Sequence, residues 1–255
     1  MFRIGSFAVR WYGLFFALSF YLGYLIMERI FKKEDVPIPV LDSLATYMII
    51  ATVIGARLGH VLFYQPGYYF AHPIEILKIW EGGLASHGAA LGIIFALWLF
   101  SRNHQKTFFW TIDRIVIVVA LAGFFIRMGN LMNSEIYGTT TNLPWGFIFV
   151  NDRAGDGLPH HPTQIYEALS YLAIFGYLLR HYIKKNGKPI EGYLFSIFLI
   201  LVFGVRFIIE FIKNVQVPEE SKYILDLGQI LSIPLILAGG VLLWYIHKKE
   251  RLKSE

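Results

Sequence analysis

The sequence contains no cysteine among its 255 residues. This absence excludes disulfides, thiolate metal sites, cysteine-ligated iron–sulfur clusters and a catalytic cysteine. Charge is scarce as well, because only 16% of the residues are Asp, Glu, Lys or Arg, against about 25% in soluble globular proteins. So little charge cannot coat a water-soluble enzyme of this length. The hydrophobic share of 56% and the mean hydropathy of +0.52 also exclude a disordered chain.

Two catalytic motifs are missing too. No G-x-S-x-G nucleophile elbow and no G-x-x-x-x-G-K-[ST] phosphate loop occurs. An enzyme with this sequence would therefore activate a nucleophile that its substrate brings. No cofactor is expected. No metal site is expected either, because the adjacent His160 and His161 would point to opposite sides of an extended chain.

Long apolar runs predict an all-α integral membrane protein with seven transmembrane helices, since a span needs about 20 mostly apolar residues. We expect the first run to be retained rather than cleaved as a signal peptide, because no small-residue cleavage site follows it. Residues 1–255 are expected to form a single seven-helix membrane domain. The expected spans are Trp11–Met27, Leu41–Tyr64, Leu84–Phe100, Thr111–Met132, Thr163–Ile183, Ile190–Ile212 and Ile224–Ile246.

Lys and Arg are distributed unequally between alternate connections. Thirteen lie in one set of connections and five in the other. Because short cytoplasmic loops collect basic residues, the N-terminus is expected outside and the C-terminus in the cytoplasm. This bias accounts for the net charge of +5, so no nucleic-acid partner is expected. The five residues on the expected outer side are Arg3, Lys78, Arg153, Lys213 and Lys222.

On this topology every span carries polar residues in its outer half. A charged group at mid-membrane costs about 2.5–3.5 kcal/mol and usually faces a protein interior or a water-filled cavity. The pattern therefore predicts one shared polar cavity. Structural ion pairs between helices are the alternative, above all for Arg206 and Glu210, which share a helix face. The residues are Arg10, Tyr12, Arg57, His87, Arg127, Asn130, Asn133, Gln164, Glu167, Arg206, Glu210, Asp226 and Gln229.

Two outer connections are long. In residues 66–83, Glu75, Lys78 and Glu81 recur every third position beside apolar residues. This pattern predicts an interfacial amphipathic arm, although a plain surface helix fits as well. Residues 134–162 are rich in turn formers and predict a small extracytoplasmic cap.

The expected cavity combines arginines with a histidine. Arginine binds phosphate through two parallel hydrogen bonds, so an anionic phospholipid of the outer leaflet is a natural ligand. His87 lies in GGLASHGAALG, where small residues allow close approach of a helix or ligand. It could accept a proton from a nucleophile, or it could be a hydrogen-bonded interhelical residue. Tyr12 could equally be an aromatic of the membrane interface.

Residues 127–138 read RMGNLMNSEIYG and resemble the signature of the bacterial prolipoprotein diacylglyceryl transferase family. The segments RWYG, ARLGHVLFY, WEGGLASHGAALG, HPTQIYE, GVRFIIEF and LGQILSIP are also similar to family segments, in family order. Ile126 and Leu131 depart from the signature, where the family has glycine and phenylalanine. The signature positions kept are Arg127, Gly129, Asn130, Asn133, Glu135 and Gly138.

The resemblance implies an enzyme of the bacterial cytoplasmic membrane. The family transfers the diacylglyceryl group of phosphatidylglycerol to the thiol of the lipobox cysteine in a prolipoprotein, forming a thioether and releasing glycerol phosphate. The implied partners are phosphatidylglycerol, the prolipoprotein signal peptide and membrane lipids. A transporter or channel for an anionic solute is the alternative. It would need polar residues along a whole path, including the inner half.

The resemblance also implies roles for individual residues. Arg127 and Arg206 would hold the lipid phosphate and stabilise the leaving group. His87 would accept the thiol proton, with Glu135, Glu167 and Glu210 as competing bases. The remaining substrate-binding residues would be Tyr12, Asn130, Asn133, Glu135, Gly138 and Glu210.

Overall fold

The computed structural model describes residues 2–4, 7–9, 11–152, 155–214 and 225–254. Arg10, one of the predicted cavity residues, lies outside the described residues, as do Arg153 and Lys222. Each of the seven apolar runs contains a long helix. These are α1 (Trp11–Lys33), α2 (Ile38–Phe63), α4 (Ser86–Asn103), α5 (Phe108–Asn133), α6 (Thr163–Lys184), α7 (Tyr193–Glu210) and α8 (Leu227–Ser254).

Five of these helices, within the described ranges, are long and apolar enough to cross a membrane: α1, α2, α5, α7 and α8. The protein is therefore a helical, multi-pass membrane protein. Helix α4 begins with Ser-His and ends with Arg-Asn, and α6 carries Glu167, Arg180 and Lys184, so both are more polar than the other five. Seven spans remain a prediction.

The chain divides into two compact units, which are described separately. The first comprises Met1–Met27 and Asp113–Glu255, and the second comprises Glu28–Ile112. Helices α1 and α5 each contribute residues to both units.

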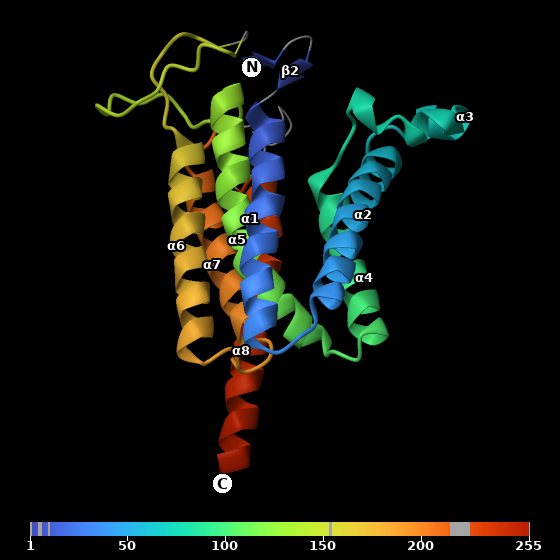
Figure 1. Cartoon of the computed structure of the whole chain (residues 1–255). Coiled ribbons are helices and arrows are strands. Elements are labelled where there is room, and N and C mark those ends of the chain that lie inside the picture. Colours follow the sequence, from blue (N-terminus) through green and yellow to red (C-terminus); the bar gives the residue numbers. More distant parts are fainter. Residues whose placement is uncertain (1, 5–6, 10, 153–154, 215–224, 255) are drawn as a thin grey trace. The chain divides into compact units, whose positions relative to one another are not determined.

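In the first unit, α6 and α8 both pack against α7 (Figure 1). Asp113 of α5, fully buried, fixes the beginning of α7. Its carboxylate accepts hydrogen bonds from the backbone N–H groups of Gly192 and Phe195, each at 2.8 Å. A helix N-terminus leaves N–H groups without internal partners, so a carboxylate from a neighbouring helix caps α7.

In the second unit, α2 and α4 pack closely, and glycines allow the approach (Figure 1). A Cβ atom on Gly88 would lie 2.3 Å from the carbonyl oxygen of Gly55 and 2.6 Å from the Cα of Gly59. One on Gly92 would lie 2.7 Å from the carbonyl oxygen of Ala51. Such small-residue contacts are typical of helix pairs in membranes. The expected close approach beside His87 is confirmed as helix against helix.

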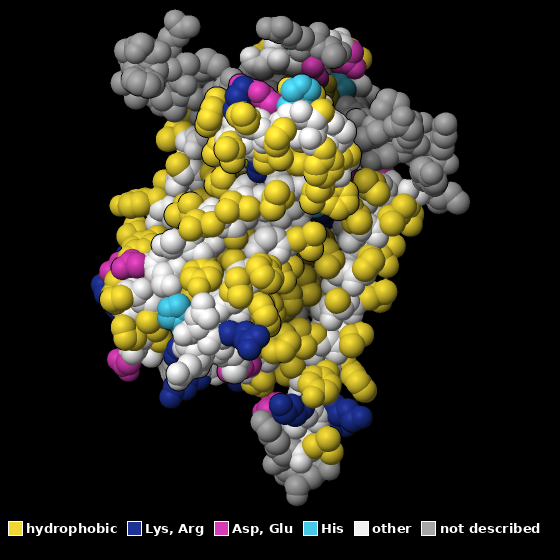
Figure 2. Space-filling model, turned by 90° about the vertical axis from the view of Figure 1, so that its right-hand side faces the viewer, with side chains coloured by type: hydrophobic (Ala, Val, Ile, Leu, Met, Phe, Trp, Pro, Cys, Tyr) yellow, Lys and Arg dark blue, Asp and Glu magenta, His cyan; other side chains and the backbone are white. Residues whose placement is uncertain are grey.

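Hydrophobic side chains cover much of the visible described surface (Figure 2). Exposed apolar residues of α2 include Ile49, Ile50, Ile54, Leu58 and Leu62, each about half exposed. A soluble protein rarely exposes so large an apolar surface. The helices therefore present to lipid what a soluble protein would bury.

The connections are less regular than predicted. Residues 66–81 form one short helix, α3 (Pro66–Ala71), and two 3-10 turns, η1 (Pro73–Leu77) and η2 (Ile79–Glu81), instead of one continuous helix. The three-residue charge period fits 3-10 geometry, in which positions i and i+3 are aligned. Accordingly, Lys78 Nζ lies 2.6 Å from Glu75 and 4.0 Å from Glu81.

Two short strands precede α1, β1 (Phe2–Ile4) and β2 (Phe7–Val9), paired antiparallel with Phe2 opposite Val9. This hairpin was not predicted from the sequence. The cap residues 134–162 follow α5 and contain antiparallel bridges between Thr140 and His160 and between Phe147 and His160.

Candidate functional site

Polar side chains gather at one end of the first unit. This is where α5 and α7 end and where α1, α6 and α8 begin, below the cap (Figure 1). Antiparallel helices bring the late residues of one element beside the early residues of the next. The predicted convergence of these five helices is therefore observed in the first unit.

A buried chain of alternating charges forms the centre of this end. Arg127 Nε lies 2.7 Å from Glu167 Oε2, and Lys213 Nζ lies 3.4 Å from Glu167 Oε1 and 3.1 Å from Glu210 Oε2. The side chains are 12%, 0%, 2% and 10% exposed in the order Arg127, Glu167, Lys213, Glu210. Buried charges require partners, and here two cations neutralise two carboxylates.

The signature residues continue this chain toward solvent. Arg127 Nη1 donates to Asn130 Oδ1 at 3.1 Å, and Asn130 Nδ2 donates to Glu135 Oε2 at 3.1 Å. Asn133 Nδ2 donates to the other oxygen, Glu135 Oε1, at 2.7 Å. Because α5 ends at Asn133 and Ser134 adopts a positive φ of 57°, the chain turns back and brings Glu135 over the helix end. The spacing of the signature residues is explained by this geometry, because Arg127, Asn130 and Asn133 lie on the last turns of α5 and Glu135 lies in the turn that follows.

Arg206 differs from Arg127 in its surroundings. It is half-buried, and among the described residues no acidic side chain forms an ion pair with it. The alternative that Arg206 and Glu210 form a structural pair is not what the structure shows, since Glu210 contacts Lys213. Arg206 therefore keeps an uncompensated positive charge at this end of the unit.

Tyr12 lies in the first turn of α1, against α5. A Cβ atom on Gly129 would come within 2.9 Å of the Tyr12 ring, so the glycine of the signature makes room for this aromatic side chain. The ring is half-buried rather than fully exposed. Tyr12 therefore lies against Gly129, the residue that precedes Asn130.

Gly138 is buried where three segments meet. Its N–H donates to the carbonyl of His161 at 2.8 Å, and it forms an antiparallel bridge with Lys213. A Cβ atom here would lie 2.5 Å from the carbonyl oxygen of Ile212, so only glycine fits. Glycine is required at position 138 because the backbone of the cap packs directly against the chain that follows α7.

The cap contributes titratable groups beside Gly138. His160 Nδ1 lies 2.8 Å from the Gly138 carbonyl, and Nε2 lies 2.9 Å from Asp156 Oδ1. The hydrogen bond from His160 lowers the pKa of Asp156. Tyr137 donates to Asp152, and this hydrogen bond, with burial, raises the pKa of Tyr137 to about 12. His160 thus has a structural position in the cap.

His87 and Arg57 belong to the second unit. His87 is exposed in the first turn of α4, with its ring 5.1 Å from that of Phe63 and 5.9 Å from that of Tyr64. Its position follows from the Gly88 packing and from the bond between Ala85 N–H and the Ala56 carbonyl at 2.9 Å.

The interpretation of Arg57 as a cavity residue is not supported by its contacts. It is buried, and its guanidinium donates to backbone carbonyls of the connection that follows α2, including Ile76 at 2.9 Å, Gly82 at 2.7 Å and Gly83 at 3.1 Å. Its side chain also lies over the Tyr69 ring. Arg57 therefore holds residues 69–83 in place. The position of Arg57 within its predicted span could not show that backbone carbonyls of the following connection accept its hydrogen bonds.

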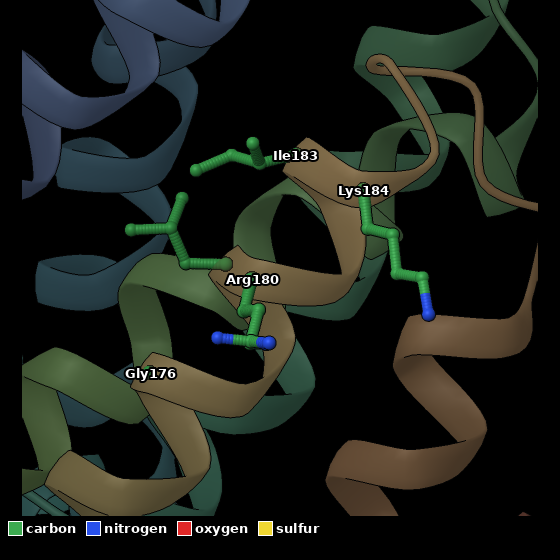
Figure 3. Close-up of a pocket in the computed structure, with 5 residues that line it drawn as sticks. Gly176, Arg180, Ile183 and Lys184 are labelled. Atoms are coloured by element: carbon green, nitrogen blue, oxygen red, sulfur yellow. The ribbon is translucent and has the colours of Figure 1, made fainter.

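A separate hollow of about 550 Å³ lies on α6, lined by Gly176, Leu179, Arg180, Ile183 and Lys184 (Figure 3). Arg180 follows Glu167 by 13 positions on the same helix, which at 1.5 Å per residue corresponds to about 20 Å. The hollow is therefore not part of the candidate site.

Sequence reasoning missed Lys213 as a member of the site and treated it as a loop charge. Its spacing was a usable signal, because Arg206, Glu210 and Lys213 follow at four and three residues, the interval of one helix face. Glu167 was predicted as a polar residue and a competing base, but not as the partner of Arg127. Gln164 was named only as polar. Its Nε2 donates to the Glu135 carbonyl at 2.6 Å and so fixes the turn after α5.

This arrangement suits the binding of an anion beside polar hydrogen-bonding groups. Arg206 offers a guanidinium without an ion-pair partner among the described residues. The polar groups beside it run from the buried Asn130 through the half-buried Asn133 to the exposed Glu135. An arginine at such a site can hold a phosphate and stabilise charge that develops on it.

The chain is similar to known proteins along almost its whole length. Residues 1–245 match the model of the family described as prolipoprotein diacylglyceryl transferase. A phosphatidylglycerol–prolipoprotein diacylglyceryl transferase from Tolumonas auensis is 51% identical over 249 residues, covering 97% of this chain and 95% of that protein. Proteins of the same name from Chloroherpeton thalassium (44% identical, covering 100% and 94%) and Porphyromonas gingivalis (45%, covering 96% and 90%) are also similar.

Proposed function

Because the chain belongs to the prolipoprotein diacylglyceryl transferase family, we propose that it transfers the diacylglyceryl group of phosphatidylglycerol to the thiol of a prolipoprotein lipobox cysteine. The C–O bond between the glyceryl carbon and the phosphate breaks, a thioether forms, and glycerol phosphate leaves with the bonding electrons. The chain is a transferase, and the reaction is the first step of lipoprotein maturation. The attacking thiol comes from the substrate, which agrees with a chain that lacks cysteine.

The observation that carries this proposal is the unequal pairing of the two arginines. Arg127 is neutralised by Glu167, whereas Arg206 has no acidic partner in the described parts of the chain. We assign the first contact with the lipid phosphate to Arg206. Arg127, held by Glu167 and Asn130, would complete the phosphate site. Both would stabilise the phosphate as it leaves.

The signature residues would orient the lipid headgroup. Asn130 and Asn133 hold Glu135 in place through its two carboxylate oxygens, and Glu210, bound to Lys213, would help to orient the arginines. Tyr12 and the cap, residues 134–162, would place the signal peptide beside the site, and Gly138 would contribute by packing the cap against the chain after α7. The arm, residues 66–83, would lie in the outer membrane interface, where its exposed Ile74, Leu77 and Trp80 could enter the lipid.

We assign the general base to His87. The thiolate is the attacking form of a cysteine, and a neutral imidazole nitrogen can accept the proton of the thiol. His87→Asn keeps the size and polarity of the side chain but cannot accept the proton. We expect it to lower kcat by about 100-fold or more, within the usual range of general-base contributions.

The measurement for His87 is kcat of the purified variant between pH 6 and pH 9. Activity that stays near that of the unaltered protein across this range would place the base elsewhere, with Glu135 as the next candidate. His60→Asn, in the same unit but stacked on Tyr64 and edge-on to Tyr69, is a matched control for a histidine outside the reaction.

The proposed function is tested by supplying phosphatidylglycerol and a lipobox peptide to the purified protein in nanodiscs. The peptide should gain the mass of one diacylglyceryl group, and glycerol phosphate should be released in equal amount. A peptide with serine in place of the lipobox cysteine should gain nothing. Turnover of the serine peptide, or no gain on the cysteine peptide, would contradict the proposal. The relatives' names do not favour the transporter alternative, which predicts flux of an anion across vesicles without peptide modification.

A further inference from the structure

Glu210 has a cation on either side of it along the chain, and it contacts only one of them through an ion pair. Arg206 precedes it by four residues and Lys213 follows it by three. An Arg–Glu pair at this spacing shares a helix face and can form an ion pair. In the structure, however, Glu210 Oε2 lies 3.1 Å from Lys213 Nζ, and within the described ranges Arg206 has no carboxylate partner.

Lys213 is fixed in this position from several directions. Its side chain is 2% exposed, and Glu167 Oε1 forms a second contact at 3.4 Å. Its backbone bridges to Gly138, and the next N–H, of Asn214, donates to the Tyr137 carbonyl. A buried ammonium without anions would be costly, so the two carboxylates and the lysine hold one another.

The carboxyl group of Glu210 is also confined by α8. A Cβ atom on Gly228 would lie 2.6 Å from Glu210 Cδ, so the backbone of α8 closes directly over this carboxyl. Between α8 and Lys213, the carboxylate is held on the side of the buried cation. Arg206, half-buried, stays unpaired.

We propose that Lys213 is a positioning residue that binds Glu210 and so keeps the guanidinium of Arg206 available for the lipid phosphate. A carboxylate and a phosphate compete for the same planar fork of an arginine. Without Lys213, the Glu210 carboxylate would be free to pair with the Arg206 guanidinium one helical turn away. It would then occupy the place of the lipid phosphate. The inference rests on the proposed function, because it assigns the competing anion to the lipid substrate.

The experiment compares Lys213→Met, Lys213→Arg, Glu210→Gln and the double variant Lys213→Met/Glu210→Gln. Lys213→Met keeps an unbranched side chain that is one atom shorter, and it removes the charge. We expect it to raise KM for phosphatidylglycerol by about tenfold, the effect of one charged hydrogen bond, with a smaller change in kcat. Lys213→Arg should remain within about twofold of the unaltered protein, because a cation again engages Glu210.

The double variant separates the proposal from a merely structural role. In the Lys213→Met background, Glu210→Gln removes the competing carboxylate and should lower KM again by at least half of the increase. If Lys213 only supports the fold, the second substitution should add to the damage. The proposal is overturned if Glu210→Gln raises KM in both backgrounds, or if Lys213→Arg behaves like Lys213→Met. Should Lys213→Met fail to accumulate in membranes, Lys213→Gln serves the same comparison.

A second readout does not depend on turnover. Retention of phosphatidylglycerol by each purified variant, measured by native mass spectrometry, should fall in Lys213→Met and recover in the double variant. A protein that retains the lipid in this order but modifies no lipobox peptide would contradict the proposed function and leave the role of Lys213 standing. Equal retention in all variants, with transfer intact, would contradict the role of Lys213 alone.

Discussion

At the scale of single residues, the two arginines of the site carry the same charge in different surroundings. Arg127 lies between Glu167 and Asn130, and its removal leaves a fully buried carboxylate with one cation fewer. Among the described residues, no buried carboxylate forms an ion pair with Arg206, so its removal leaves none unpaired. Their substitutions should therefore differ in stability as well as in activity.

We expect Arg206→Ala to lower transfer by about 100- to 1000-fold, the usual effect of losing a group that stabilises developing charge, with little change in thermal stability. Arg127→Ala should abolish transfer and also destabilise the protein by about 3 kcal/mol, because it breaks a buried ion pair. Thermal unfolding in detergent, together with the peptide assay, measures both effects. Full activity of membrane-inserted Arg127→Ala would refute the assigned role.

Tyr137 gives the cap a dependence on alkaline pH. Its neutral phenol donates to Asp152, and its pKa is raised from 10.0 to about 12. A group whose pKa is higher in the folded state contributes stability that is fully present below its unfolded pKa and is lost as pH rises through the folded value. The cap should therefore loosen between about pH 10 and pH 12.

Hydrogen exchange of residues 137–152 as a function of pH measures this loosening. Tyr137→Phe lacks the titrating phenol and should show a weaker cap with no transition in this range. Tyr166→Phe, which removes a phenol bonded to Trp145 at 2.9 Å, is the control. If Tyr137→Phe still lost its hydrogen-exchange protection in this pH range, the loosening of the cap would be due to another titrating group.

At the scale of elements, the α2–α4 pair positions His87 through backbone contact. Gly88 follows His87 and touches Gly55 and Gly59 so closely that no side chain fits. The first turn of α4 is thus fixed by a helix interface rather than by a side-chain cap, since α4 has no side-chain hydrogen bond at its N-cap.

Gly88→Ala should force α2 and α4 apart and destabilise the protein by about 1–3 kcal/mol, the typical cost of overpacking. The same displacement should lower transfer, because it moves His87. Gly176→Ala on α6 has no atom within 4 Å of the new methyl group, so it should leave transfer unchanged and should not destabilise the protein. Thermal unfolding and the peptide assay provide the comparison, and a fully stable Gly88→Ala protein would contradict the interface.

At the scale of the whole molecule, the distribution of charge along the chain predicts its orientation in the membrane. Basic residues concentrate in the connections expected on the cytoplasmic side, including the end of α8. The predicted site lies toward the opposite side, where a secreted precursor and an outer-leaflet lipid would meet it.

The absence of cysteine makes this orientation directly measurable. A membrane-impermeant maleimide should label Trp145→Cys, in the exposed cap, in intact spheroplasts. It should label Lys249→Cys, near the exposed end of α8, only after the membrane is opened. The reverse pattern would invert the topology and would place the site on the cytoplasmic side.

Much of the fold was predictable from local sequence. The seven apolar runs match seven long helices to within a few residues at most ends. The signature around Arg127 predicted a group of polar residues that the structure places together, because residues near a helix terminus are neighbours in sequence and in space. The hairpin before α1 and the broken arm were not predicted, since short polar connections carry weak periodic signals.

The amino-acid sequence by itself determined the membrane environment, the helices and the gathering of polar residues at one end, because the transfer of each side chain from water to lipid is a property of that residue. Only the tertiary structure decided the ionic partners. Arg57 binds loop carbonyls, Arg127 binds Glu167 across 40 positions, and Lys213 binds Glu210 in place of Arg206. Which partner each cation binds depends on the distances between elements, because the energies of ion pairs and hydrogen bonds fall steeply with distance.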